Sequence, residues 1–147
     1  MDDLGELRAR LRDLEDREGI RRTIQEYRRT LDARELGAFA ALFAPDGTWS
    51  GRSGRATGPE AIERMLRGSL EDNPPAPGPT LYHLNTDPAI EIDGSRATAF
   101  AFWLHVRRGA DGRPLLPTLG SYDDVLVRDE HRWRFFERRV TVLMVTP

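Results

Sequence analysis

The stretch LYHLNTDPAIEIDGSRATAFAFWLHVRR, at Leu81–Arg108, decides the fold class of this chain. It holds two runs rich in aromatic and apolar residues, LYHLNTDPAIEI and RATAFAFWLHVRR, on either side of the turn sequence DGS. Two such runs around a glycine-containing turn predict an antiparallel β-hairpin. Further strand-like runs, each after a turn, are LLPTLGSYDDVLVR at residues 115–128 and RWRFFERRVTVLMV at residues 132–145. The second half of the chain is therefore expected to form a meander of long strands.

The N-terminal part of the chain shows helical periodicity. Four leucines, hereafter the leucine stripe, recur at helical spacing: Leu4, Leu7, Leu11 and Leu14. This narrow stripe is similar to a coiled-coil seam of under three heptads, and either a partner helix or the chain's own domain could cover it. A second stripe follows, made of Ile20, Ile24, Tyr27 and Leu31. Gly19 is expected to weaken or break the helix between the stripes, and Asp16 to lie at the start of the second one.

Two more helical segments precede the strands. LGAFAALFAPDG is expected to end in a turn at residues 45–47, and TGPEAIERMLRGSLED has a capping residue followed by proline at its start. GTWSG at residues 47–51 predicts a short strand, and NPPAPGPT at residues 73–80 predicts a loop. Helices followed by strands predict an α+β fold, with the helices on one face of an antiparallel sheet. The length predicts one domain, residues 1–147, in which residues 1–15 form an N-terminal helical extension.

The composition argues against several classes of protein. The formal net charge is −2, so no strong positive field points to nucleic acid as a partner. No apolar run approaches the ~20 residues that a membrane helix needs, so no membrane association is expected. The N-terminal sequence MDDLGELRAR lacks the basic start and apolar core of a secretory signal, and a cytoplasmic protein is therefore expected.

The chain contains no cysteine and no lysine, because all 22 basic residues are arginine. Thiol nucleophiles, thiolate metal sites and lysine Schiff bases are therefore excluded. Proton transfer is left to Asp, Glu, Tyr and three histidines, His83, His105 and His131. The histidines lie in separate segments without metal-ligand spacing, and no phosphate-binding loop is present, so neither a metal nor a cofactor is expected. His105 lies in an apolar strand and fits a core or pocket position, whereas His131 lies in a turn and is expected to be exposed.

Two residues remain ambiguous by pattern alone. His83 follows the proline-rich loop at the start of a strand, where site residues are common. Strict alternation nevertheless groups it with Glu91 on a wet face, unless Pro88 marks a bulge that resets the facing. Asp32 lies about 140° around its helix from Tyr27, at the margin of the buried stripe, which favours a surface acid.

Several segments together resemble the SnoaL-like branch of the nuclear-transport-factor-2-like superfamily. LEDREGIRRTIQEYRRTLDARELGAFAALFAPDGTW is similar to the opening of that family, GPEAI to its third helix, YHLNTDPAIEIDGSRATAFAFW to its histidine strand and hairpin, and RWRFFERRV to its last strand. The resemblance extends from about Leu14 to the end of the chain. It implies a cone in which three helices wrap a strongly curved, mainly antiparallel sheet around an apolar pocket.

The resemblance also implies a set of site residues. Enzymes of the family pair a histidine at the start of a pocket strand with an aspartate at the end of the first helix, and His83 and Asp32 match these positions. Tyr27 matches a tyrosine five residues before that aspartate, and Arg138 matches a pocket arginine. Asp87 stands where the family commonly has an amide. The implied pocket and substrate-binding residues are Phe43, Trp49, Met65, Trp103 and His105, with Tyr27 also in the wall.

The resemblance implies a cofactor-free lyase of dehydratase type, or a cyclase or isomerase, acting on an apolar cyclic small molecule. In this interpretation His83 moves a proton and Asp32 orients its ring. A non-catalytic module for small-molecule binding or assembly stays an alternative, as does an accessory subunit of an oxygenase. The strand sequences ATAFAFWLHV and VTVLMV carry more large apolar side chains than one inner face needs, so a homodimer or homotrimer is expected.

Overall fold

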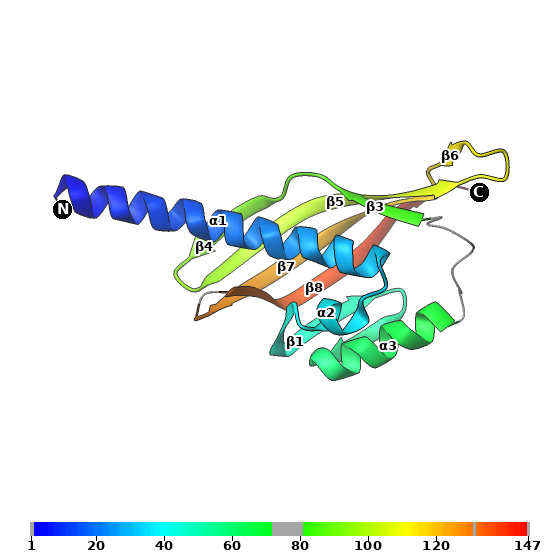
Figure 1. Ribbon diagram of the computed structural model, residues 1–147, viewed down its shortest axis with the longest axis horizontal. Coiled ribbons are helices and arrows are strands. Elements are labelled where there is room, and N and C mark those ends of the chain that lie inside the picture. The colour runs from blue at the N-terminus through cyan, green and yellow to red at the C-terminus, as the bar shows by residue number, and fades with distance from the viewer. Residues whose placement is uncertain (1, 72–80, 131, 147) are drawn as a thin grey trace.

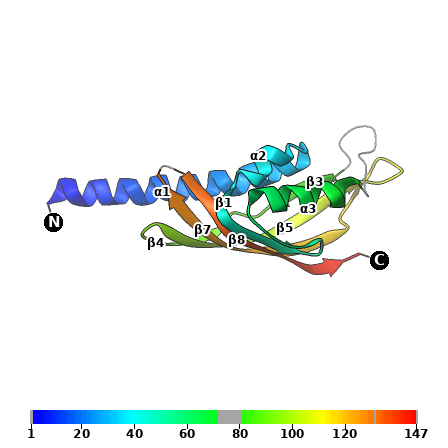
Figure 2. The same ribbon diagram turned by 90° about the horizontal axis from the view of Figure 1, so that it is seen from below.

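Three helices lie on one face of a curved sheet (Figures 1 and 2). The computed structural model describes residues 2–71, 81–130 and 132–146, so the predicted loop at residues 73–80 and His131 lie outside the described residues. Within these ranges the helices are α1 (Asp3–Asp32), α2 (Leu36–Ala40) and α3 (Pro59–Glu71). This arrangement confirms the predicted α+β class and the curved, helix-wrapped sheet. None of the described helices is long and apolar enough to cross a membrane.

The sheet is mainly antiparallel and stays open. Its described strands are β1 (Phe43–Gly51), β2 (Gly54–Thr57), β3 (Leu81–Asn85), β4 (Ala89–Asp93), β5 (Arg96–Arg108), β6 (Pro114–Leu115), β7 (Thr118–Asp129) and β8 (Arg132–Val145). They follow the order β2-β1-β8-β7-β5-β3, and β4 and β6 also pair with β5. The pairing of β1 with β8 is parallel and the others are antiparallel. The predicted meander of β5, β7 and β8 therefore forms the middle of the sheet.

Helix α1 runs unbroken through Gly19, so the expected break at this glycine is wrong. The neighbouring strand supplies the reason for the glycine, because a Cβ at this position would lie 3.0 Å from Cδ1 of Trp133 in β8. The glycine lets the helix lie close to the sheet. Asp16 likewise starts no helix. Its carboxylate accepts a hydrogen bond from Trp133 Nε1 at 2.9 Å and pairs with Arg128 at 2.8 Å.

Two other expected boundaries differ in the structure. The predicted turn at residues 45–47 lies inside β1, where the register against β8 shifts between Phe43 and Thr48. The expected single strand LYHLNTDPAIEI is divided into β3 and β4. In both places a local irregularity bends the strand, as a β-bulge does, and proline removes a donor from the ladder.

The division between β3 and β4 reverses the facing of the side chains. His83 and Asn85 are half-buried, and so are Ile90 and Ile92, although the two pairs differ in parity along the chain. Simple alternation, which put His83 on the wet face, is therefore wrong, and the alternative of a reset near Pro88 is confirmed. The inner face of β3 thus looks toward the helices, and its outer face carries exposed apolar side chains.

The core lies between α1, α2, α3 and the inner face of the sheet. Its largest buried apolar side chains include Ile20, Ile24, Tyr27, Phe39, Phe43, Trp49, Ile62, Trp103, Tyr122, Leu126, Trp133 and Phe135. Full burial of one such side chain contributes about 1.5–3 kcal/mol, so these contacts dominate the stability of the fold. Two charged residues, Asp124 and Arg138, are buried in the same layer.

Candidate active site

Asp32 and His83 form a close pair between the end of α1 and the start of β3. His83 Nδ1 lies 2.5 Å from Asp32 Oδ1, and the backbone N–H of His83 donates to Asp32 Oδ2 at 3.1 Å. The two side chains keep only 13% and 22% of their surface exposed, His83 and Asp32 respectively. The predicted contact is therefore present, and one carboxylate holds both the backbone and the ring of the histidine.

This contact depends on where the two elements end. Asp32 is the last residue of α1, which stops at Ala33 and turns through Arg34 at a positive φ of 57°. Strand β3 is the last strand on the path through the sheet, and no strand of the described residues lies along its outer edge to accept its N–H groups. Asp32 satisfies the N–H of His83 on that edge. An ionised carboxylate only accepts, so a neutral His83 ring that donates to it carries its proton on Nδ1 and its lone pair on Nε2.

His105 and Trp103 support the histidine ring from β5. His105 is directly opposite His83 in the β3–β5 ladder, and the two rings meet edge to face at 4.4 Å. The Trp103 ring lies 4.6 Å from that of His105, and its Nε1 donates to the carbonyl of Ser121 at 3.1 Å. Gly120, opposite Trp103, leaves room for the indole, because a Cβ there would overlap the Trp103 ring.

The surroundings of His105 lower its affinity for a proton. Burial and, less strongly, the nearby His83 lower the pKa of His105, the charge of Asp32 partly opposes them, and the net pKa is about 4. His105 is therefore neutral at pH 7. Its ring packs edge to face against the His83 ring.

Arg138 and Asp124 form a second cluster in the core. Arg138 Nε and Nη2 donate to the two oxygens of Asp124 at 2.8 and 2.7 Å, and both side chains are essentially unexposed. The guanidinium lies over three aromatic rings, with its carbon 3.8 Å from the centre of Tyr122, 4.1 Å from Tyr27 and 4.3 Å from Phe135. The two hydrogen bonds to Asp124 fix the orientation of the guanidinium against the three aromatic rings.

Burial, more than charge, sets the protonation state of the tyrosines in this cluster. Burial lowers the pKa of Arg138, but Asp124 more than offsets it, and the net pKa is raised, so Arg138 stays charged. Burial raises the pKa of Tyr27, and Arg138 and the hydrogen bond from Trp49 only partly oppose it. Tyr27 therefore keeps its proton. Its oxygen accepts from Trp49 Nε1 at 2.9 Å, and its O–H has no acceptor among the described residues.

Tyr122 links the two clusters. Its ring lies 5.6 Å from Tyr27 and 6.0 Å from Trp103, and its hydroxyl is buried. Burial raises the pKa of Tyr122 most, and Tyr27, Asp124 and, least of all, Asp32 raise it further, while the charge of Arg138 opposes them. The charges of Asp32 and Arg138 thus both act on Tyr122, across the inner face of β5 and β7.

Some polar atoms on this inner face have no partner among the described residues. Arg138 Nη1 and both polar atoms of the Asn85 amide are buried without a hydrogen bond. Asn85 lies two residues after His83 on the same face of β3. An unsatisfied buried polar group costs about 1–3 kcal/mol, so such groups often mark a place for a ligand or a bound water.

The predicted substrate-binding residues divide into two groups. Trp49 contacts Tyr27. Trp103 and His105 are in contact with each other, and His105 also contacts His83. Phe43 instead packs against Phe39 and Phe135, at ring distances of 5.8 and 5.2 Å, deep in the core. Met65 is partly buried against the same core. No ring contact or hydrogen bond among the described residues joins Phe43 or Met65 to the Asp32–His83 pair.

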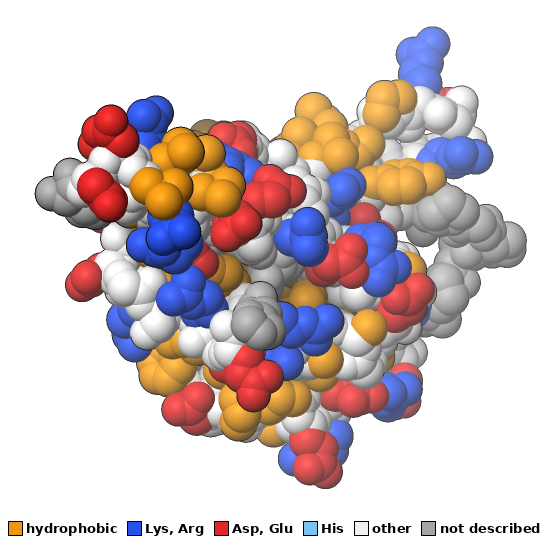
Figure 3. All heavy atoms as spheres, turned by 60° about the vertical axis from the view of Figure 1, so that its left-hand side comes forward, with side chains coloured by type: hydrophobic (Ala, Val, Ile, Leu, Met, Phe, Trp, Pro, Cys, Tyr) orange, Lys and Arg blue, Asp and Glu red, His pale blue; other side chains and the backbone are white. Residues whose placement is uncertain are grey.

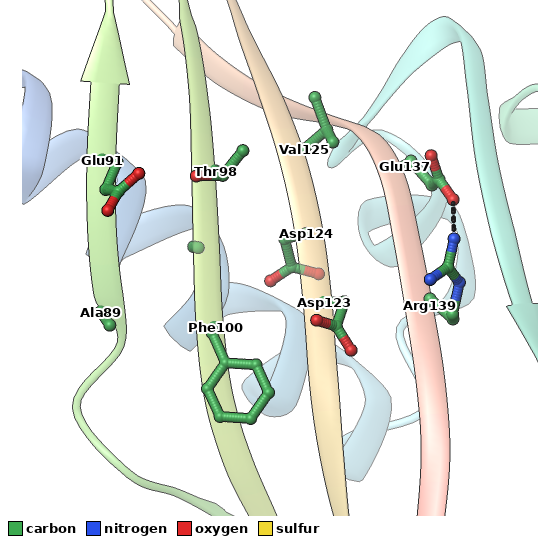
Figure 4. Close-up of a pocket in the computed structure, with 10 residues that line it drawn as sticks. Ala89, Glu91, Thr98, Phe100, Asp123, Asp124, Val125, Glu137 and Arg139 are labelled. Carbon is green, nitrogen blue, oxygen red and sulfur yellow. Dashed lines mark hydrogen bonds and ion pairs between the residues drawn. The ribbon is translucent and has the colours of Figure 1, made fainter.

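A groove of about 430 Å³ lies on the other face of the sheet, across β4, β5, β7 and β8 (Figure 4). Its lining mixes acidic residues, among them Glu91, Asp123 and Glu137, with apolar side chains, and Arg139 donates to Glu137 at 3.1 Å. None of the predicted pocket residues lines this groove, so it is not the apolar pocket expected from the sequence. That pocket stays a prediction. No group of three or more His, Asp or Glu among residues 2–71, 81–130 and 132–146 is arranged to hold a metal.

Sequence reasoning missed Asp124, Tyr122 and Asn85. A signal for Asp124 exists, since it alternates with Tyr122 and Leu126 on a face that is otherwise apolar. An acid in such a position needs a buried cation, and Arg138 is its neighbour in the β7–β8 ladder. Asn85 was hidden by the reversal of facing after β3.

Comparison with known proteins places this geometry in a family. The SnoaL-like domain model matches residues 12–139. An NTF2-like protein with a cystatin-like fold from Novosphingobium aromaticivorans has 28% identity and a TM-score of 0.82, over 97% of this chain and 92% of that one. A scytalone dehydratase-like protein from the same organism has 25% identity and a TM-score of 0.72, over 91% and 88%.

LinA shares the fold at 20% identity and a TM-score of 0.78, over 93% of this chain and 92% of that one. No curated protein is a significant match to the chain. The family model covers most of the sequence, and it includes both Asp32 and His83. The chain belongs to the SnoaL-like domain family.

Proposed function

We propose that the protein is a cofactor-free lyase or cyclase that acts on an apolar, cyclic small molecule by His–Asp acid–base catalysis. The observation that carries this proposal is the Asp32–His83 pair, at 2.5 Å between Oδ1 and Nδ1. Similarity to a scytalone dehydratase-like protein at 25% identity supports a dehydratase in particular. The fold alone would not, since one fold hosts many chemistries.

In the proposed reaction His83 Nε2 removes a proton from a carbon next to a carbonyl group. Asp32 keeps the other ring proton on Nδ1 and stabilises the imidazolium that forms. The electron pair of the broken C–H bond forms a C=C bond, and a hydroxyl group on the next carbon leaves. It leaves as water with the proton now held by His83 or with one donated by Tyr27. A positioned base of this kind contributes about 10²–10⁴-fold to the rate.

The polar atoms without partners fit the oxygens of such a substrate. Arg138 Nη1 and the Asn85 amide are buried and unpaired among the described residues, and the Tyr27 hydroxyl can still donate. We propose that Arg138 stabilises the negative charge that develops on the carbonyl oxygen. Asp124 holds the guanidinium for this role and does not itself touch the substrate. The aromatic side chains Trp49 and Trp103 would contact the apolar ring.

An isomerisation or a ring closure would use the same residues, because both begin with the same proton abstraction. A non-catalytic binding module is a different class of function. It would need the pocket but not the basic Nε2 of His83. The exposed apolar side chains on the outer sheet face, such as Phe100 and Phe102, favour in addition a homodimer or homotrimer.

The proposal is tested by product analysis. The protein is incubated with a panel of cyclic β-hydroxyketones and aromatic polyketides, and loss of water or a change of ring number is followed by mass spectrometry. We expect turnover of at least one compound by the wild type and none by the folded His83→Ala variant. A ligand that binds tightly but is released unchanged, equally by both proteins, would instead support the binding module.

A further inference from the structure

The leucine stripe is left uncovered by the chain's own domain. Helix α1 extends well past the end of the sheet (Figure 1), and the stripe lies on this extension. The exposed fractions of its side chains are 53% for Leu4, 62% for Leu7, 54% for Leu11 and 63% for Leu14. Figure 3 shows hydrophobic side chains gathered beside the N-terminal end, with acidic and basic groups around them. Of the two coverings left open by the sequence, packing on the chain's own domain is therefore wrong.

The stripe also points away from the sheet. Successive residues of a helix are rotated by about 100°, so the stripe lies roughly opposite Ile20, Ile24 and Tyr27, which pack on the sheet. A second helix could therefore lie along the stripe without displacing any part of the domain. The next positions of the stripe, Glu18 and Arg21, are polar, so the apolar contact ends where α1 meets the sheet.

The charges beside the stripe identify the occupant. In a heptad with Leu4 and Leu11 at a, the flanking g positions are Asp3 and Arg10, and the flanking e positions are Arg8 and Glu15. A parallel copy would place each g residue against the e residue five positions later. Asp3 would then face Arg8 of the second copy, and Arg10 would face Glu15 of the second copy, which are opposite charges. An antiparallel copy would bring the two Arg8 side chains together, and the two Arg10 side chains.

These four charged side chains are available for such pairs. All are exposed, and none makes an ion pair with another residue in the described part of the chain. The helix that carries them is already formed, because Asp2 caps it by accepting from the N–H of Gly5 at 2.7 Å, and its later turns are held by the core. Association would not have to nucleate a helix, which is the unfavourable step for short coiled coils.

We propose that residues 3–15 form a parallel two-stranded coiled coil with the same residues of a second copy of this chain. The two domains lie on opposite sides of the coiled coil and diverge after Leu14. This contact is separate from the outer face of the sheet and from the Asp32–His83 pair. It does not rest on the proposed catalytic function.

The orientation is tested by cross-linking. The chain has no cysteine, so Leu14→Cys introduces a single thiol in the full-length protein. In a parallel pair the two copies of this position face each other within the Cα separation of about 4.4–6.8 Å that a disulfide needs. We expect mild oxidation to convert this variant to covalent dimer. The matched control, Arg12→Cys, lies on the same exposed turn but off the stripe and should stay uncoupled. Equal cross-linking of the two variants, or none at position 14, would overturn the proposal.

The charge pattern is tested by a swap. Asp3→Arg should weaken the association measured by sedimentation roughly tenfold, because two attractive pairs become repulsive. The double variant Asp3→Arg/Arg8→Glu restores opposite charges only in the parallel arrangement and should recover the wild-type dissociation constant. Failure of the second substitution to rescue the first, with helicity unchanged, would exclude the parallel pairing.

Discussion

At the scale of single residues, Tyr27 illustrates how one side chain serves both packing and chemistry. Its oxygen accepts the hydrogen bond of the buried Trp49 Nε1 at 2.9 Å. Tyr27→Phe would leave that donor without a partner, so we expect the free energy of unfolding to fall by about 1–3 kcal/mol in urea titrations. Turnover should fall by only about tenfold, since water can replace a single donor. The control Tyr82→Phe, on an exposed tyrosine, should change neither quantity.

His105 makes the free energy of unfolding depend on pH. Its pKa is about 4 in the folded protein and about 6.5 when unfolded. Between these values only the unfolded chain takes up the proton. The contribution of His105 to the free energy of unfolding is therefore fully present above pH 6.5 and is lost as the pH drops toward 4. The loss should be on the order of 1–2 kcal/mol, because the ring is only partly buried. The denaturation midpoint should fall less steeply between pH 7 and pH 4.5 for His105→Gln than for the wild-type protein. Parallel curves for the two proteins would show that His105 does not contribute.

At the scale of elements, the buried Asp124–Arg138 pair joins β7 to β8 beneath the tyrosines. Asp124→Asn leaves a buried guanidinium without its counter-charge, and we expect it to cost about 3–5 kcal/mol of the free energy of unfolding. The neighbouring Asp123 faces outward and is exposed. Asp123→Asn should therefore cost less than about 0.5 kcal/mol in the same urea titration. Similar losses in the two variants would contradict the role given to the pair.

The elements themselves were largely predictable from the sequence, and their irregularities were not. Period-two runs predicted β5, β7 and β8, because the alternation between inward-facing and outward-facing side chains is repeated many times in a long strand. The break between β3 and β4 depends on a few residues around Pro88, and it decides whether His83 faces the core or solvent. Gly19 looked like a helix breaker because the sequence does not show its contact with Trp133, more than a hundred residues away, which leaves no room for a larger side chain.

The Asp32–His83 pair shows the same limit. Angular position on α1 favoured a surface acid, and only the resemblance to a family suggested the contact with His83. The contact exists because a helix end and a sheet edge meet, which no local pattern encodes. Asp124 was missed for a similar reason, since its buried position becomes visible only when β7 and β8 are paired.

At the scale of the whole molecule, the outer face of the sheet carries exposed apolar side chains, among them Tyr82, Leu84, Phe100 and Phe102. We expect this face to be covered in a homodimer or homotrimer, and light scattering at micromolar concentration should give a mass of at least two chains. Phe102→Glu should lower the assembly order, and Arg113→Glu, in an exposed loop, should not. A monomeric wild-type protein would contradict this expectation.

In the proposed mechanism the carboxylate of Asp32 makes His83 an effective base. The most direct test is the turnover of an identified substrate by Asp32→Asn, compared with Asp46→Asn, which makes the same change at an exposed site in β1. An amide can keep a hydrogen bond to the ring but cannot stabilise the imidazolium. We predict that Asp32→Asn stays folded and loses about 10²–10⁴-fold in kcat, while Asp46→Asn retains the wild-type rate. Near-normal turnover by folded Asp32→Asn would contradict the account and leave Asp32 as a structural acid at a helix end.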